Sequence, residues 1–164
     1  MTDEAPASPP DESPFRGGFR FLAGDDDVTI DVWGSDLTEV LARLAEAVFH
    51  AAGEPTSLAP AAPFRVEARG DTTVELVDAF IGVLSAMYRS EGRFASVAMC
   101  RSVIAIEEGG KLPPGIAAVL ICDGGHVDAE HDPTLRRISP SDAATGVWEE
   151  NGILRVRFHL QLED

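Results

Sequence analysis

The stretch GDDDVTIDVWGSDLTEVLARLAEAVF, residues 24–49, decides the fold, because it predicts an acidic turn, a strand, a tight turn and a helix in succession. Its β-branched residues alternate with other side chains, which is typical of a strand with one face in a core. These apolar positions are Val28, Ile30 and Val32. Gly34 ends the strand, and Ser35 or Asp36 can cap the following helix by accepting a backbone N–H bond.

From this stretch outward, a helix is expected up to residue 51, with one apolar stripe facing the core. The stripe consists of Leu37, Val40, Leu41, Leu44, Ala45, Val48 and Phe49. Upstream, residues 18–22 are expected to form a strand that pairs with the first one across the turn at 24–27, because Gly and Asp tolerate the backbone angles of a hairpin.

Downstream, a strand at 64–68 leads to a second helix, whose cap is Asp71, Thr72 or Thr73. Further strands are expected at 96–106, 116–122 and 153–162. A polar, proline-containing loop is expected over residues 126–148, with a short strand at its end. This order predicts an α+β fold in which two helices pack on a mostly antiparallel β-sheet.

The composition predicts one globular domain at 18–164, after an acidic Pro/Ser-rich tail at 1–17 that is expected to be disordered. The 28 acidic and 13 basic residues give a net charge of −15, which opposes direct binding to nucleic acid or to anionic membranes. No run is long enough to span a membrane, so a cytoplasmic location is expected. The two cysteines are interpreted as buried apolar residues.

The opening stretch resembles the archease family, small accessory proteins of the tRNA-splicing ligase. The family pattern is an aromatic strand, His-Thr-Ala-Asp-Val, a strand ending in Trp-Gly, and Asp/Ser-Leu-x-Glu at the start of a helix. Asp27 and Val28 match the Asp-Val of that pattern, whereas its His and Thr are replaced by Gly24 and Asp25. The remaining matches are Phe19, Phe21 and the run Trp33-Gly34-Ser35-Asp36-Leu37-Thr38-Glu39. The resemblance covers residues 18–162 and implies the same α+β architecture.

The resemblance also implies a divalent-metal site. The family ligands are the Asp of His-Thr-Ala-Asp and an Asp in the last strand, which correspond here to Asp27 and His159. An imidazole at the second position favours Zn²⁺ over Ca²⁺ or Mg²⁺, and Asp25 or Asp26 would supply further oxygen ligands. The family's Lys-Ala-x-Thr-x-His stretch corresponds to residues 140–145, which lack Lys and His.

Three functions follow as hypotheses. The first is a non-enzymatic accessory protein that assists activation of an RNA-splicing ligase, its protein partner, through a metal-loaded acidic site. The second is an interaction module of the same fold that has lost the metal and the ligase role. The third, a metal-dependent enzyme using His126 and His131, is least favoured because their spacing is irregular and no catalytic motif is present. The oligomeric state stays open.

Overall fold

The computed structural model describes residues 17–22, 27–111 and 113–163. The predicted tail at 1–17, except Gly17, and the two acids Asp25 and Asp26 lie outside these ranges. The described elements follow one another in this order along the chain. They are β2 (Gly18–Leu22), β3 (Asp27–Gly34), α1 (Leu37–Ala51), β4 (Ala59–Pro60), β5 (Phe64–Gly70), α2 (Thr73–Glu91), β6 (Arg93–Ile106), β7 (Gly115–His126), β8 (Arg137–Pro140), β9 (Gly146–Glu150) and β10 (Ile153–Glu163).

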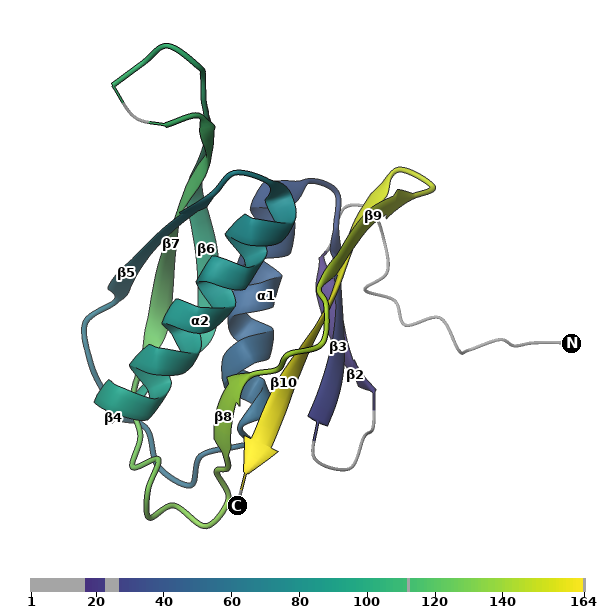
Figure 1. Ribbon diagram of the computed structural model, residues 1–164. Coiled ribbons are helices and arrows are strands. Elements are labelled where there is room, and N and C mark those ends of the chain that lie inside the picture. Colours follow the sequence, from purple (N-terminus) through teal and green to yellow (C-terminus); the bar gives the residue numbers. More distant parts are fainter. Residues whose placement is uncertain (1–16, 23–26, 112, 164) are drawn as a thin grey trace, which may run out of the picture.

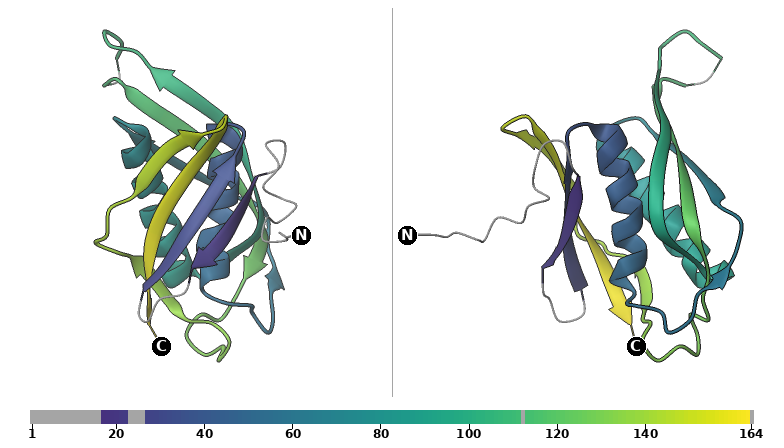
Figure 2. Two further views of the ribbon diagram at one scale, coloured as in Figure 1. Left: turned by 90° about the vertical axis from the view of Figure 1, so that its right-hand side faces the viewer. Right: turned by 180° about the vertical axis from the view of Figure 1, so that it is seen from behind.

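The α+β class is confirmed, and the described strands divide between two antiparallel sheets (Figure 1). The first sheet has the order β2-β3-β10-β8, with β9 also paired to β10. In the second, β7 is central and pairs with β4, β5 and β6. Figure 2 shows α1 between the two sheets. Each sheet therefore has an inner face toward the helices and an outer face away from them.

This position makes α1 buried on more sides than its sequence predicts. The expected stripe is buried except for Leu37, which is half-buried, and Ala42, Glu46 and Ala47 are buried as well. The prediction of a single core-facing stripe is therefore too narrow, because α1 packs against β3 on one side and β6 on the other. Small alanine side chains allow both sheets to approach the helix closely. No helix in the described ranges is long and apolar enough to cross a membrane.

The helix caps resolve the alternatives left open by the sequence. Asp36 caps α1 by accepting a 2.9 Å hydrogen bond from the backbone N–H of Glu39. Thr72 caps α2 in the same way, with a 3.2 Å bond from the N–H of Glu75. Both first-turn glutamates bond back to the backbone before the cap, so both helix starts are closed reciprocally.

The region expected to be a long loop, residues 126–148, contains an additional strand. β8 pairs with the end of β10, so that Ile138 lies opposite Leu162 and is fully buried. This strand is short and polar apart from Ile138, and Pro140 ends it. Its sequence therefore lacks strand periodicity, and only the partner β10 defines it. The short strand predicted at the end of the loop is present as β9.

One edge of the second sheet is held by α1. The carboxylate of Glu46 accepts a 2.9 Å hydrogen bond from the N–H of Ala98 in β6, and Arg43 donates a 3.2 Å bond to the carbonyl of the same residue. Arg43 and Glu46 also form an ion pair at 3.1 Å. These contacts satisfy backbone groups beside an irregularity in the β6–β7 pairing, where unpaired polar groups would be costly.

Candidate functional site

The candidate site lies on the outer face of the first sheet, where β3 and β10 run antiparallel. Asp27 pairs with Gln161 in this register, and Thr29 pairs with His159. Side chains alternate between the two faces of a strand, so the predicted ligands Asp27 and His159 lie on the same face as diagonal neighbours. Such neighbours are about 7–8 Å apart. The structure thus brings together two residues that are far apart in the sequence.

Asp27 is exposed at the beginning of β3. Ser141, which follows β8, directs its hydroxyl Oγ toward the Asp27 carboxylate at 3.4 Å. The other two predicted acids, Asp25 and Asp26, lie outside the described residues. Ser141 and Gln161 were not singled out from the sequence, although Ser141 falls within the stretch matched to the family's Lys-Ala-x-Thr-x-His. Both supply neutral oxygen atoms beside Asp27.

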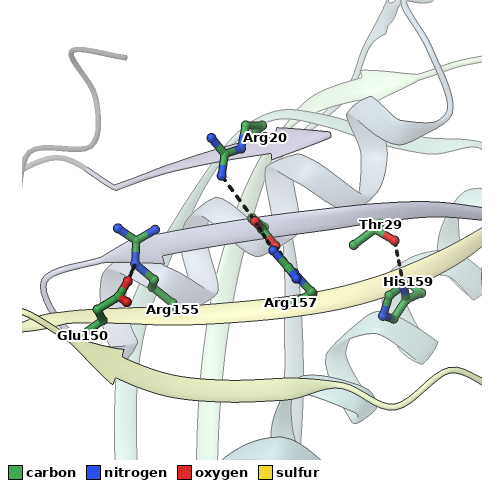
Figure 3. Close-up of polar contacts among 7 residues, drawn as sticks. Arg20, Thr29, Glu150, Arg155, Arg157 and His159 are labelled. Carbon is green, nitrogen blue, oxygen red and sulfur yellow. Dashed lines mark hydrogen bonds and ion pairs between the residues drawn. The ribbon is translucent and has the colours of Figure 1, made fainter. Parts of the chain in front are cut away.

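His159 is half-buried, and its Nδ1 forms a 2.9 Å hydrogen bond with the Thr29 hydroxyl (Figure 3). This contact orients the ring and leaves Nε2 as the nitrogen for any further partner. His159 also lines a pocket of about 280 Å³ between β10, α2 and residues 140–145. Thr145 closes one wall of that pocket with a 2.5 Å hydrogen bond to Asp78 of α2. Asp78 carries no signal in the sequence beyond its charge.

The described residues provide only part of a metal site. They contain no group of three or more His, Cys, Asp or Glu side chains close enough to hold a metal ion. Asp27 provides a single carboxylate, and the position opposite it is the amide Gln161. A hard cation such as Ca²⁺ or Mg²⁺ takes six or more oxygen ligands, including water. These residues fit such a cation only if Asp25 or Asp26 contributes carboxylates.

Next to this site, an ion-pair network joins three strands of the first sheet (Figure 3). Arg157 donates two hydrogen bonds, of 2.6 and 2.9 Å, to the Asp31 carboxylate, and Arg20 lies 3.5 Å from it. The hydrogen bonds from Arg157 hold the pKa of Asp31 below its ordinary value, although burial opposes them. The Arg157 guanidinium also lies 5.9 Å from the ring centroid of Trp148 in β9.

The segment proposed for the enzyme hypothesis does not assemble a metal centre. His131 bonds to Asp128 at 3.0 Å, and His126 bonds instead to the backbone carbonyl of Glu91 at 3.2 Å. Asp132 accepts hydrogen bonds from the backbone and hydroxyl groups of Thr56 and Thr134, which hold its pKa far below the ordinary value. The hydrogen bonds of Asp132 therefore connect the loop that contains Thr56 to the loop that contains Asp132 and Thr134.

The fold defines a class of small α+β proteins in which two helices pack against antiparallel sheets. The model of the Archease protein family (MTH1598/TM1083) matches residues 19–133, so the chain belongs to the archease family. A search of curated proteins finds no match.

The solution structure of Methanobacterium thermoautotrophicum protein 1598 has a similar fold. The TM-score is 0.66 at 21% sequence identity, and the alignment covers 88% of this chain and 99% of that one. The family match ends at residue 133, before β8, β9 and β10. Asp27 therefore lies within the matched segment, whereas His159 and Ser141 lie beyond it.

Proposed function

We propose that this protein is an accessory factor that assists activation of a cytoplasmic RNA-splicing ligase, and that the face around Asp27 is the part that acts on the ligase. The observation that carries the proposal is the position of Asp27 in an archease fold, at an exposed strand end beside the pocket that His159 lines. The chain's −15 charge favours encounter with a basic surface of the ligase.

In this proposal a divalent metal ion links the acidic face to the partner. Asp27 would hold it together with Asp25 or Asp26, and the Ser141 hydroxyl and the Gln161 amide oxygen lie on the same face. The bound ion would supply positive charge that attracts an anionic group of the partner or its nucleotide. His159 would join through Nε2 if the ion is Zn²⁺, which accepts imidazole ligands readily.

The test is a reconstituted ligation assay with the RNA ligase of the same source organism, with and without this protein. Asp27→Asn preserves size and removes one charge. We expect it to reduce the stimulation of ligation at least about tenfold, because even loss of a residue that only supports a metal ligand costs about 10–100-fold in metal affinity or activity. Asp123→Asn is the matched control, because Asp123 is also exposed but lies on the second sheet. Equal stimulation by the Asp27 variant and the control would contradict the proposal.

A second candidate is a metal-free interaction module of the same fold. The incomplete set of ligands favours it, because the described residues contain no group of three or more His, Cys, Asp or Glu side chains that could hold a metal ion. Calorimetric titration with Ca²⁺, Mg²⁺, Mn²⁺ and Zn²⁺ separates the two candidates. Binding that is lost in Asp27→Asn supports the metal-loaded accessory protein, and absence of binding by the unmodified chain supports the module.

A further inference from the structure

The central strand of the second sheet is apolar on both faces. Residues 116–122 of β7 form an uninterrupted apolar run, Ile-Ala-Ala-Val-Leu-Ile-Cys. Ala118, Leu120 and Cys122 face the helices and are buried, whereas the alternate residues point outward and are half-buried. Continuous apolar runs are typical of strands that are covered on both faces. Within the described residues, helices cover only the inner face of β7, and no helix covers its outer face.

The neighbouring strand β6 extends this apolar surface. Val97, Met99 and Ile104 are 59%, 60% and 58% exposed, more than any other large hydrophobic residue that the structure describes. Met99 lies opposite Ile121, and Ile104 lies opposite Ala117. Single exposed apolar residues are ordinary, but a contiguous group across two strands marks an interaction surface.

On the other side of β7, strand β5 adds charged side chains to the same surface. Arg65 and Arg69 lie opposite Ile121 and Ala117, with Glu67 between them. These three residues line a groove of about 460 Å³ together with Ile104 of β6 and with Ala117 and Val119 of β7. Arg65 pairs with Glu67 at 3.3 Å, and Arg69 gives β5 a local positive excess, although the whole chain carries −15. Asp123, which lies opposite Val97, is an acidic residue at the other end of the surface. This surface is called the outer β7 face below. It consists of Arg65, Glu67, Arg69, Val97, Met99, Ser102, Ile104, Ala117, Val119, Ile121 and Asp123.

We propose that the outer β7 face binds an amphipathic helix of a partner protein, whose apolar stripe is flanked by Asp and Glu side chains. Charge complementarity with the arginines selects an acidic helix. A helix about 10–12 Å across covers three strands spaced about 4.8 Å apart, which is the width from β5 to β6. The proposal does not rest on the ligase role, because this face and the Asp27 face belong to different sheets, on opposite sides of α1 (Figure 2).

A second copy of the chain is a poorer occupant. Packing two such faces together would join two chains that carry −15 each. The open edge of β6 is also less available for strand pairing, since Arg43 and Glu46 occupy the backbone groups of Ala98. An acidic helix from another protein avoids both costs.

The test uses two labelled synthetic peptides of about 18 residues, long enough to be helical. They share a leucine stripe, which is flanked by Glu in one and by Lys in the other, and fluorescence anisotropy measures their binding to the full chain. We expect the Glu peptide to bind at least tenfold more tightly. The double variant Arg65→Glu/Arg69→Glu should reverse this preference, and Met99→Asp should weaken binding of the Glu peptide at least tenfold.

Two further variants keep the test decisive. Ile104→Thr retains β-propensity and should weaken binding even if Met99→Asp were to disturb the fold. Val83→Asp is the control, because Val83 is 38% exposed but lies on α2, and its peptide binding should be unchanged. Equal affinity for both peptides, or no saturable binding of either, would overturn the proposal.

Evidence for either of two other binding partners would also overturn the proposal. Light scattering that shows a concentration-dependent dimer, lost in Met99→Asp, would assign the face to a second copy. Co-sedimentation with phosphatidylserine vesicles that Arg65→Glu/Arg69→Glu abolishes, without preference for the Glu peptide, would assign it to a membrane surface.

Discussion

Arg157 donates two parallel hydrogen bonds to Asp31 across the β3–β10 pair, at 2.6 and 2.9 Å. Asp31 is only 6% exposed although it lies on the outer face of its sheet, and Arg20 approaches it from β2 at 3.5 Å. One carboxylate therefore joins three strands. It also supports the register in which Asp27 and His159 become neighbours, so the network and the candidate site depend on the same strand pairing.

Replacing Asp31 by Asn should destabilise the fold. The amide keeps the size of the side chain but cannot accept both bonds from Arg157. We expect the free energy of unfolding to fall by about 2 kcal/mol, within the range for hydrogen bonds to charged groups. The loss should stay below that of a fully buried pair, because Arg157 is 45% exposed. Urea denaturation measures it. Arg20→Gln should change stability by less than about 1 kcal/mol, as exposed ion pairs do, and equal losses would contradict this account.

The same carboxylate should make stability depend on pH under acidic conditions. The pKa of Asp31 is lowered in the fold, chiefly by its hydrogen bonds from Arg157. A group with a lowered pKa contributes stability that is present above its unfolded-state pKa of about 3.9, and lost as pH falls through its folded pKa. The free energy of unfolding should therefore decline below about pH 4, and less steeply in Asp31→Asn. Chemical denaturation at a series of pH values tests this difference, and identical slopes would refute it.

Replacing Glu46 by Ala should release β6 from α1. The N–H of Ala98 would lose its acceptor at a buried position, and Arg43 would lose its ion pair. We expect a loss of about 2 kcal/mol, the usual cost of a buried donor left without a partner. Amide hydrogen exchange at Ala98 should accelerate. Glu46→Gln retains an acceptor oxygen and should lose less, so a larger loss for Gln than for Ala would be inconsistent with the proposed contact.

Two glycines in or next to α2 should respond to Ala in opposite directions. Gly92 ends the helix with φ +66°, and an added Cβ would lie 2.5 Å from the carbonyl oxygen of Val127. Gly92→Ala should cost about 2 kcal/mol, since the left-handed conformation alone costs 1–2 kcal/mol. Gly82 lies inside the helix with nothing within 4 Å of an added Cβ. Gly82→Ala should therefore stabilise by up to about 1 kcal/mol. Thermal melts of both variants test the contrast.

Releasing residues 141–145 should affect function more than stability. Thr145→Val removes the hydrogen bond to Asp78 that ties this segment to α2, while Ser141 faces Asp27 from the same segment. Stability should change by less than about 1 kcal/mol, because this hydrogen bond is exposed to solvent. If the Asp27 face acts on a ligase, stimulation of ligation should fall several-fold. Thr145→Ser keeps the hydroxyl and should restore the stimulation of ligation. If it does not, residues 141–145 play no part in that stimulation.

The local elements could be predicted from the sequence because their signals are local. Alternating β-branched residues before Gly34 predicted β3, and helical spacing after Asp36 predicted α1. β8 could not be predicted, because a short polar strand becomes one only when β10 pairs with it. The extent of burial on α1 was missed for a similar reason, since a sequence stripe does not reveal that a second sheet covers another side of the helix.

For the candidate site, too, some features could be predicted from the sequence and others only from the tertiary structure. The sequence by itself determined the α+β class, the presence of both helices and the family resemblance that singled out Asp27 and His159, because those depend on residue type and spacing along the chain. Only the tertiary structure decided that Thr29 engages His159, that Ser141 faces Asp27 and that Asp78 reaches Thr145. Each of these contacts joins residues more than 60 positions apart, and strand register and helix packing, which set such distances, arise only when the whole core assembles.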